Sequence, residues 1–208
     1  MSPLALRSNG LDRARSALRE VTRDVHERLH GHPAFQRVLD ATVDASGYGT
    51  LLTRLYGFHK PLEEALHAAP SPWWFGLRPS NHRRVHRLES DLAHLAIDPR
   101  GLVRMRPPAV ASAGQLLGRL YVREGAMLGG RVLARKLDAL LGQSSQGRHF
   151  FTGSPSDRDT WADTCDALEK AGAAGHLDDM IASARATFAE FETWFDDPGR
   201  QAPDGRRQ

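Results

Sequence analysis

The chain has a single cysteine, Cys165, among 208 residues. One cysteine excludes both a disulfide framework and a CxxC redox pair. A lone cysteine in a folded chain commonly behaves as a small apolar residue. We therefore predict that Cys165 is a core residue with no chemical role.

Long apolar runs are also lacking. No run approaches the roughly 20 residues that a membrane-spanning helix needs. The first residues, Met1 to Arg7, lack the basic, apolar and small-residue order of a secretory signal. We expect no membrane segment, and we expect the protein to lie in the cytoplasm.

The chain also has little excess of charge of either sign. The formal net charge is +3 and the isoelectric point about 9.4, with basic and acidic residues interleaved along the chain. This excess is too small to indicate a nucleic-acid partner, although it favours an anionic ligand or an acidic protein. With 40% hydrophobic and 25% charged residues, the composition is that of a folded protein.

Strand patterns are nearly absent, with only a brief alternation at residues 101–105. Apolar residues instead recur with the helical period of 3.6, and Gly31 and Pro33 end the first such segment. We predict a single all-α domain over residues 11–196, a flexible N-terminus at 1–10 and a frayed tail at 197–208. Pro61 predicts a kink near Gly57. The predicted helices cover residues 11–30, 34–43, 48–67, 81–95, 110–141, 158–171 and 175–195.

The first helix carries a histidine beside its apolar stripe. Thr22, His26 and Leu29 or His30 share one face, and Arg19 precedes His26 by about two turns. A neutral imidazole in that position can bind a metal ion. By itself the pattern is weak, because most histidines beside an apolar stripe are structural.

Two further pairs have the i, i+4 spacing of metal ligands, namely Glu63 with His67 and His82 with His86. An HExxH motif is missing, and no matching set of carboxylates is evident on other helices. These pairs therefore give little support to a site with two metal ions.

The longest predicted helix contains a cluster of three interior glycines, Gly125, Gly129 and Gly130. Each costs roughly 0.5–1 kcal/mol relative to alanine. Gly118, Gly125 and Gly129 lie on one face of this helix. There the backbone can approach either a flat ligand or another helix. The spacing alone favours the second explanation.

Taken together, the two helices resemble the haem oxygenases over about Leu18 to Phe195. Residues 18–26 resemble the family's proximal helix, in which a basic residue, a threonine and the iron-ligating histidine recur. The resemblance implies a haem-oxygenase-like helical fold. It also implies that His26 is the iron ligand, that Arg19 meets a haem propionate and that Thr22 lies beside the haem.

Residues 125–130 resemble the distal helix of that family, whose glycines lie against the haem face. Gly125, Gly129 and Gly130 match, whereas Ala126 replaces the aspartate that many members carry. We interpret this replacement as a different water network in a working site formed by Gly125, Ala126 and Gly129. A second departure is His30, where many members have an acid; it either tunes the iron ligand or faces solvent.

Residues 56–63 are similar to the bacterial branch associated with phytochromes. Weaker similarity is found at residues 150–153 and 184–188. This branch implies that the product is supplied as a chromophore to a bacteriophytochrome.

The resemblance implies that haem b is both substrate and cofactor, opened with oxygen and electrons to biliverdin, carbon monoxide and ferrous iron. The chain has no GxGxxG fingerprint, so we expect a ferredoxin or a flavoprotein reductase to supply the electrons. Basic residues would help an acidic donor to dock: Arg123, Arg131, Arg135 and Lys136.

Two other functions stay open at this point. Because the distal aspartate is replaced by Ala126, the chain could hold haem or a bilin without turnover. A different enzyme on a similar fold is the other alternative. A thiaminase-like hydrolase would need a well-placed cysteine, and a di-iron oxygenase would need several carboxylate ligands.

Overall fold

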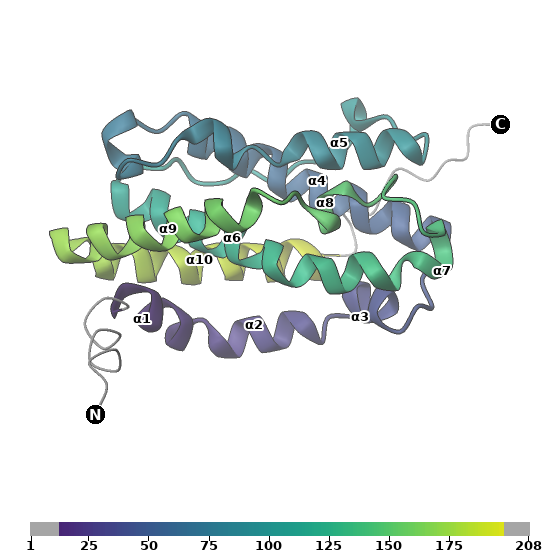
Figure 1. Ribbon diagram of the computed structural model, residues 1–208, viewed down its shortest axis with the longest axis horizontal. Coiled ribbons are helices and arrows are strands. Elements are labelled where there is room, and N and C mark those ends of the chain that lie inside the picture. Colours follow the sequence, from purple (N-terminus) through teal and green to yellow (C-terminus); the bar gives the residue numbers. More distant parts are fainter. Residues whose placement is uncertain (1–12, 198–208) are drawn as a thin grey trace.

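The computed structural model describes residues 13–197, and every regular element within this range is a helix, so the predicted all-α class is confirmed (Figure 1). The expected flexible N-terminus and all but the first residue of the expected tail lie outside this range. The α-helices are α1 (Arg13–Val21), α2 (Arg23–His30), α3 (Pro33–Leu39), α4 (Ala45–His67), α5 (Val85–His94), α6 (Ala113–Lys136), α7 (Asp138–Leu141), α8 (His149–Thr152), α9 (Asp157–Ala171) and α10 (Leu177–Asp196).

The predicted first helix is broken at Thr22, so a single helix up to His30 was wrong. The Thr22 hydroxyl donates to the carbonyl of Leu18 at 2.7 Å, a bond that bends helices. Backbone bonds from Thr22 N–H to Leu18 and from His26 N–H to Thr22, of 3.1 and 3.0 Å, still span the break. The chain therefore bends here without separating α1 from α2. As predicted, α2 ends just before Gly31.

Several predicted helix bounds differ from the structure, and the helix predicted at residues 110–141 is divided at Leu137 into α6 and α7. The helix α3 ends at Leu39, earlier than expected. The helix α5 begins only at Val85, because residues Pro79–His82 form a 3-10 turn with a proline at its start. The brief alternation at residues 101–105 forms no strand. The N–H of Met105 instead donates a hydrogen bond to α4.

The helix α4 runs uninterrupted through Pro61, which led us to expect a kink near Gly57. Proline has no N–H, so the carbonyl of Gly57 loses its partner within the helix. The Met105 N–H donates to that carbonyl at 3.0 Å. A Cβ atom at Gly57 would lie 2.4 Å from the Val103 carbonyl oxygen, so only glycine permits this close approach.

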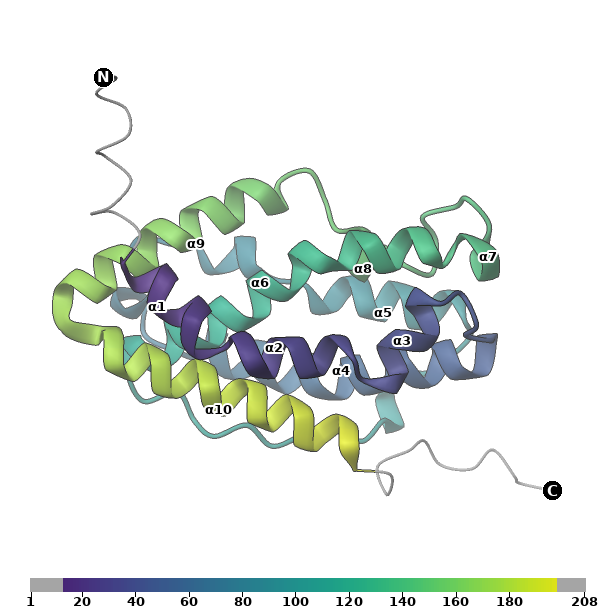
Figure 2. The same cartoon turned by 90° about the horizontal axis from the view of Figure 1, so that it is seen from below.

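The helix α6 forms the centre of the molecule, with α1 to α3 following one another along one side and α4 and α5 along the other (Figures 1 and 2). Its most extensive neighbour is α10. A Cβ atom at Gly118 would lie 2.3 Å from the Met180 carbonyl oxygen of α10. None of the described helices is both long and apolar enough to cross a membrane.

Candidate functional site

A cavity of about 680 Å³ lies between α2 and α6, and α3, α4, α8, α9 and α10 complete its walls. Its lining is predominantly apolar. Enclosed apolar cavities with a few polar groups are the usual binding sites for small molecules and cofactors. Aromatic side chains contribute to the lining from several different helices: Phe35, Phe58, Phe150, Trp161 and Phe188 are among them.

The wall formed by the end of α1 and by α2 brings together the residues predicted on this side. Arg19, Thr22, His26 and His30 all line the cavity. The His26 ring lies 4.5 Å from that of His30 and 6.4 Å from that of Phe188, measured between ring centres. Partial burial and the neighbouring His30 lower the pKa of His26. The imidazole is therefore neutral at pH 7, as a metal ligand must be.

The opposite wall is the glycine segment of α6. Gly125, Ala126, Gly129 and Gly130 all line the cavity. A Cβ atom at Gly129 would meet nothing within 4 Å, and one at Gly125 would make only ordinary contact with Trp161 at 3.7 Å. At Gly130 it would lie 2.8 Å from the Phe151 carbonyl oxygen. Gly130 therefore also serves the close packing of α6 on α8.

Gly118 does not belong to this wall, so the predicted groove that it shares with Gly125 and Gly129 was wrong. It packs against α10 and is absent from the cavity lining. Helix packing thus explains Gly118, and it explains Gly130 in part. Of the cavity-lining glycines, Gly125 and Gly129 have no contact with another helix that requires a glycine, so helix packing does not explain them.

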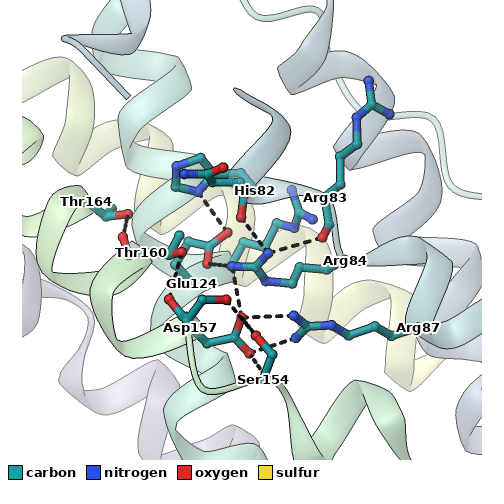
Figure 3. Close-up of polar contacts among 12 residues, drawn as sticks. His82, Arg83, Arg84, Arg87, Glu124, Ser154, Asp157, Thr160 and Thr164 are labelled. Carbon is teal, nitrogen blue, oxygen red and sulfur yellow. Dashed lines mark hydrogen bonds and ion pairs between the residues drawn. The ribbon is translucent and has the colours of Figure 1, made fainter. Parts of the chain in front are cut away.

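A buried network of ion pairs and hydrogen bonds fixes α6 through Glu124 (Figure 3). The carboxylate of Glu124 bonds His82 Nδ1 at 3.2 Å and Arg84 Nη2 at 3.1 Å. Asp157 of α9 pairs with Arg84 at 3.4 Å and with Arg87 at 2.7 Å. Burial alone would raise the pKa of Glu124, but the hydrogen bond from His82 and the nearby arginines lower it. The ionised network ties the helix that carries the glycines to α5 and α9.

Sequence reasoning missed His59, a polar residue of the cavity wall. His59 of α4 is 6% exposed, lines the cavity and has no hydrogen-bond partner for Nδ1 among the described residues. Burial and the charge of Arg123 lower its pKa to about 3, so its ring is neutral. A histidine within an apolar helix gives no sign of the cavity that it faces, so the sequence carried no usable signal.

Arg123 was expected on the surface as part of a docking patch for an acidic donor, and this was wrong. It is 2% exposed, lines the cavity and donates from Nη2 to Glu63. Arg135 and Lys136 are exposed as expected, and Arg131 is half-buried. Arg123 faces inward, toward Glu63 of α4.

In the candidate metal pairs, His67 and His82 have structural roles. The ring of His67 bonds the backbone carbonyls of Glu63 and Pro79 at 2.8 and 2.9 Å, and His82 bonds Glu124. Within residues 13–197, no three His, Cys, Asp or Glu side chains are grouped to hold a metal ion. Cys165 is buried, as predicted.

The residues of the cavity fit haem. Its apolar lining suits the faces of a porphyrin, and the neutral imidazole of His26 suits the iron. On the exposed side of the same wall, Arg19 and Arg23 offer cations to carboxylates. Leu128 and Val132 of the opposite wall are 53% and 43% exposed, which a flat apolar ligand would cover.

Comparison with known proteins identifies the family and the fold. The Heme oxygenase family model matches residues 12–197. A heme oxygenase of Xanthomonas campestris is 33% identical over 156 residues, which are 73% of this chain and 90% of that protein. The Neisseria meningitidis heme oxygenase, solved with NO and CO bound, superposes with a TM-score of 0.72 at 19% identity, covering 94% of this chain and 98% of the other. A Synechocystis heme oxygenase in complex with heme gives 0.65 at 19% identity, covering 88% and 90%. The chain belongs to the haem oxygenase family and is a haem-degrading enzyme.

Proposed function

We propose that haem lies in the cavity with its iron on His26, within the domain that we place at residues 11–196. One observation carries this assignment: a neutral imidazole and a glycine-lined helix form opposite walls of one apolar cavity. Thr22, buried beside His26, shapes the same wall. The exposed guanidinium of Arg19 pairs with a propionate at the cavity edge.

Haem, when bound, supplies both the iron that activates oxygen and the ring that is opened to biliverdin, carbon monoxide and ferrous iron. The backbone at Gly125 and Gly129 would lie against the haem face, because no side chain at these positions holds the ligand away. Ala126 adds no proton donor to this wall. The apolar side chains around them exclude bulk water, so polar groups deeper in the cavity, His59 among them, order what water remains.

The electrons come from a separate protein, a ferredoxin or a flavoprotein reductase, since the chain has no dinucleotide-binding fingerprint. Such donors are commonly acidic, and exposed cations attract them. With Arg123 buried, the exposed cations of the expected patch are Arg135 and Lys136 at the end of α6. Arg23, at the start of α2, offers another near the cavity.

The use of the product follows from the resemblance of residues 56–63 to the phytochrome-associated branch. We infer that biliverdin passes to a bacteriophytochrome in the cytoplasm. Nothing in the described residues favours a protein that only stores haem or bilin.

Turnover tests the proposal directly. The protein is loaded with haem and supplied with a reductase system and oxygen, and the Soret band is followed together with bilin absorption. We expect the Soret band to disappear as bilin absorption grows, and chromatography then identifies the bilin isomer. A Soret band that persists while electrons are consumed would instead support the non-catalytic binding protein.

A further inference from the structure

Arg123 is a buried cation with unused hydrogen-bond donors. Its Nη2 donates to Glu63, but Nε and Nη1 have no partner among the described residues. Arginine carries five N–H donors and no acceptor. A guanidinium that is 2% exposed should not leave donors unpaired, because water cannot compensate them from outside.

The negative charge beside Arg123 is heavily shared. The same Glu63 Oε2 atom accepts the backbone N–H groups of Arg84 and Val85 at 2.7 and 3.1 Å. Glu124, the next residue, is engaged by His82 and Arg84. In this weakly polarisable interior the guanidinium attracts a further acceptor strongly.

A second unsatisfied group lies within electrostatic reach of the first. His59 and Arg123 line the same cavity from different helices, α4 and α6, and Arg123 perturbs the titration of His59. The Nδ1 atom of His59 is also without a partner. With the tautomer of His59 that carries its proton on Nδ1, an occupant that bonds both groups must accept hydrogen bonds from each, and a small anion does so better than water.

We propose that Arg123 and His59 form a binding subsite for a small monovalent anion, such as azide or fluoride, inside the cavity. The subsite itself requires only the cavity walls. Its second consequence, that anionic ligands of the iron are favoured over neutral ones, rests on the proposed haem site.

The first experiment uses the protein without haem. Its unfolding temperature is measured while azide replaces gluconate, an anion too large for the subsite, at constant ionic strength. We expect azide to raise the unfolding temperature of the wild type and of Arg123→Lys. It should have no such effect on Arg123→Leu. If azide leaves the unfolding temperature of the wild type unchanged, the proposal is overturned, and water alone occupies the site.

The second experiment uses the ferric haem complex, with fluoride and azide affinities read from the Soret shift. We expect Arg123→Leu to bind both about tenfold more weakly, the loss typical of one charge-assisted hydrogen bond, and Arg123→Lys to recover most of the affinity. Carbon monoxide, a neutral ligand of the ferrous form, should bind all three proteins alike.

Arg119 supplies the matched control. It lies one turn before Arg123 on α6, is 5% exposed, pairs with Glu190 at 3.7 Å and does not line the cavity. Arg119→Leu should keep the wild-type anion affinities; an equal loss there would mean that packing, not the subsite, sets them. If the protein fails to bind haem, the proposed function fails while the first experiment still decides on the subsite.

Discussion

The two walls of the cavity are built in opposite ways. The helix α2 contains no buried residue, whereas eleven residues of α6 are buried, among them Arg119, Arg123 and Glu124. The side chains of α6 are fixed by α10, by α8 and by the ionic network behind it. The wall on which we propose the iron ligand thus has few contacts of its own, while the α6 wall is packed on its neighbours without a ligand.

This difference explains the surface features of the site. His26, Leu128 and Val132 are exposed, yet all three line one cavity. A ligand between the walls would bury them together. If haem lies in the proposed site, it completes the packing of α2, and its binding should stabilise α2 far more than α6.

The largest effect is expected from His26→Ala, which removes the bond between α2 and the ligand. Because the side chain of His26 is exposed, the apoprotein should keep its free energy of unfolding to within about 0.5 kcal/mol. The ferric haem complex should lose its axial histidine completely, and added imidazole should restore the spectrum. An unchanged spectrum and axial ligand would contradict the assignment. His30→Ala, on the next turn, is the control that keeps the ligand.

The next effect separates two glycines of α6. Gly118→Ala places a methyl group against the Met180 carbonyl and Ser183 of α10, so the helices must move apart, at a cost of about 1–3 kcal/mol. Gly129→Ala meets open space and should stabilise the apoprotein by about 0.5–1 kcal/mol. Denaturation of both apoproteins measures these signs.

The substitution Gly129→Ala should weaken haem binding without destabilising the apoprotein. A methyl group at position 129 stands on the cavity side of α6, so haem titration should give a weaker affinity for Gly129→Ala. Destabilisation by both substitutions would mean that Gly129, too, serves helix packing.

The sequence predicted the helices well because their apolar period is a local property. The break at Thr22 was missed because a threonine hydroxyl bonds its own helix only in some contexts. His26, Gly125 and Gly129 could be named from the resemblance. His59 could not, since every residue of α4 from Leu51 to His59 is buried and no polar face reveals which side meets the cavity. Arg123 was misplaced for the same reason: its direction depends on which helices surround α6.

A smaller effect concerns the network behind α6. Burial alone would raise the pKa of Asp157, but Arg87, the Ser154 N–H and Arg84 lower it to about 2 from the usual 3.8. A carboxyl with a lowered pKa stabilises the fold above pH 3.8 and loses that contribution as the pH falls toward 2. Asp157→Asn should therefore cost about 1 kcal/mol at neutral pH, after allowance for screening by solvent.

Urea denaturation between neutral pH and pH 2 tests this prediction. The difference between wild type and Asp157→Asn should shrink below pH 3.8, because the wild-type carboxyl then takes up its proton. A difference that stays constant over the whole range would show that the loss comes from packing rather than from charge.

The smallest effect is expected on the α2 wall. Arg28 of α2 pairs with Glu192 of α10 through two hydrogen bonds of 2.9 and 3.0 Å, but the pair is exposed. Exposed pairs contribute little and are screened by salt. Arg28→Ala should leave the unfolding temperature unchanged while amide hydrogen exchange in α2 becomes faster at low salt. High salt should abolish that difference, and so should haem, because the ligand then holds α2. Exchange in α2 that stays equally slow in the apoprotein variant would show that α2 has other sufficient contacts and that the two walls are less unlike than their burial indicates.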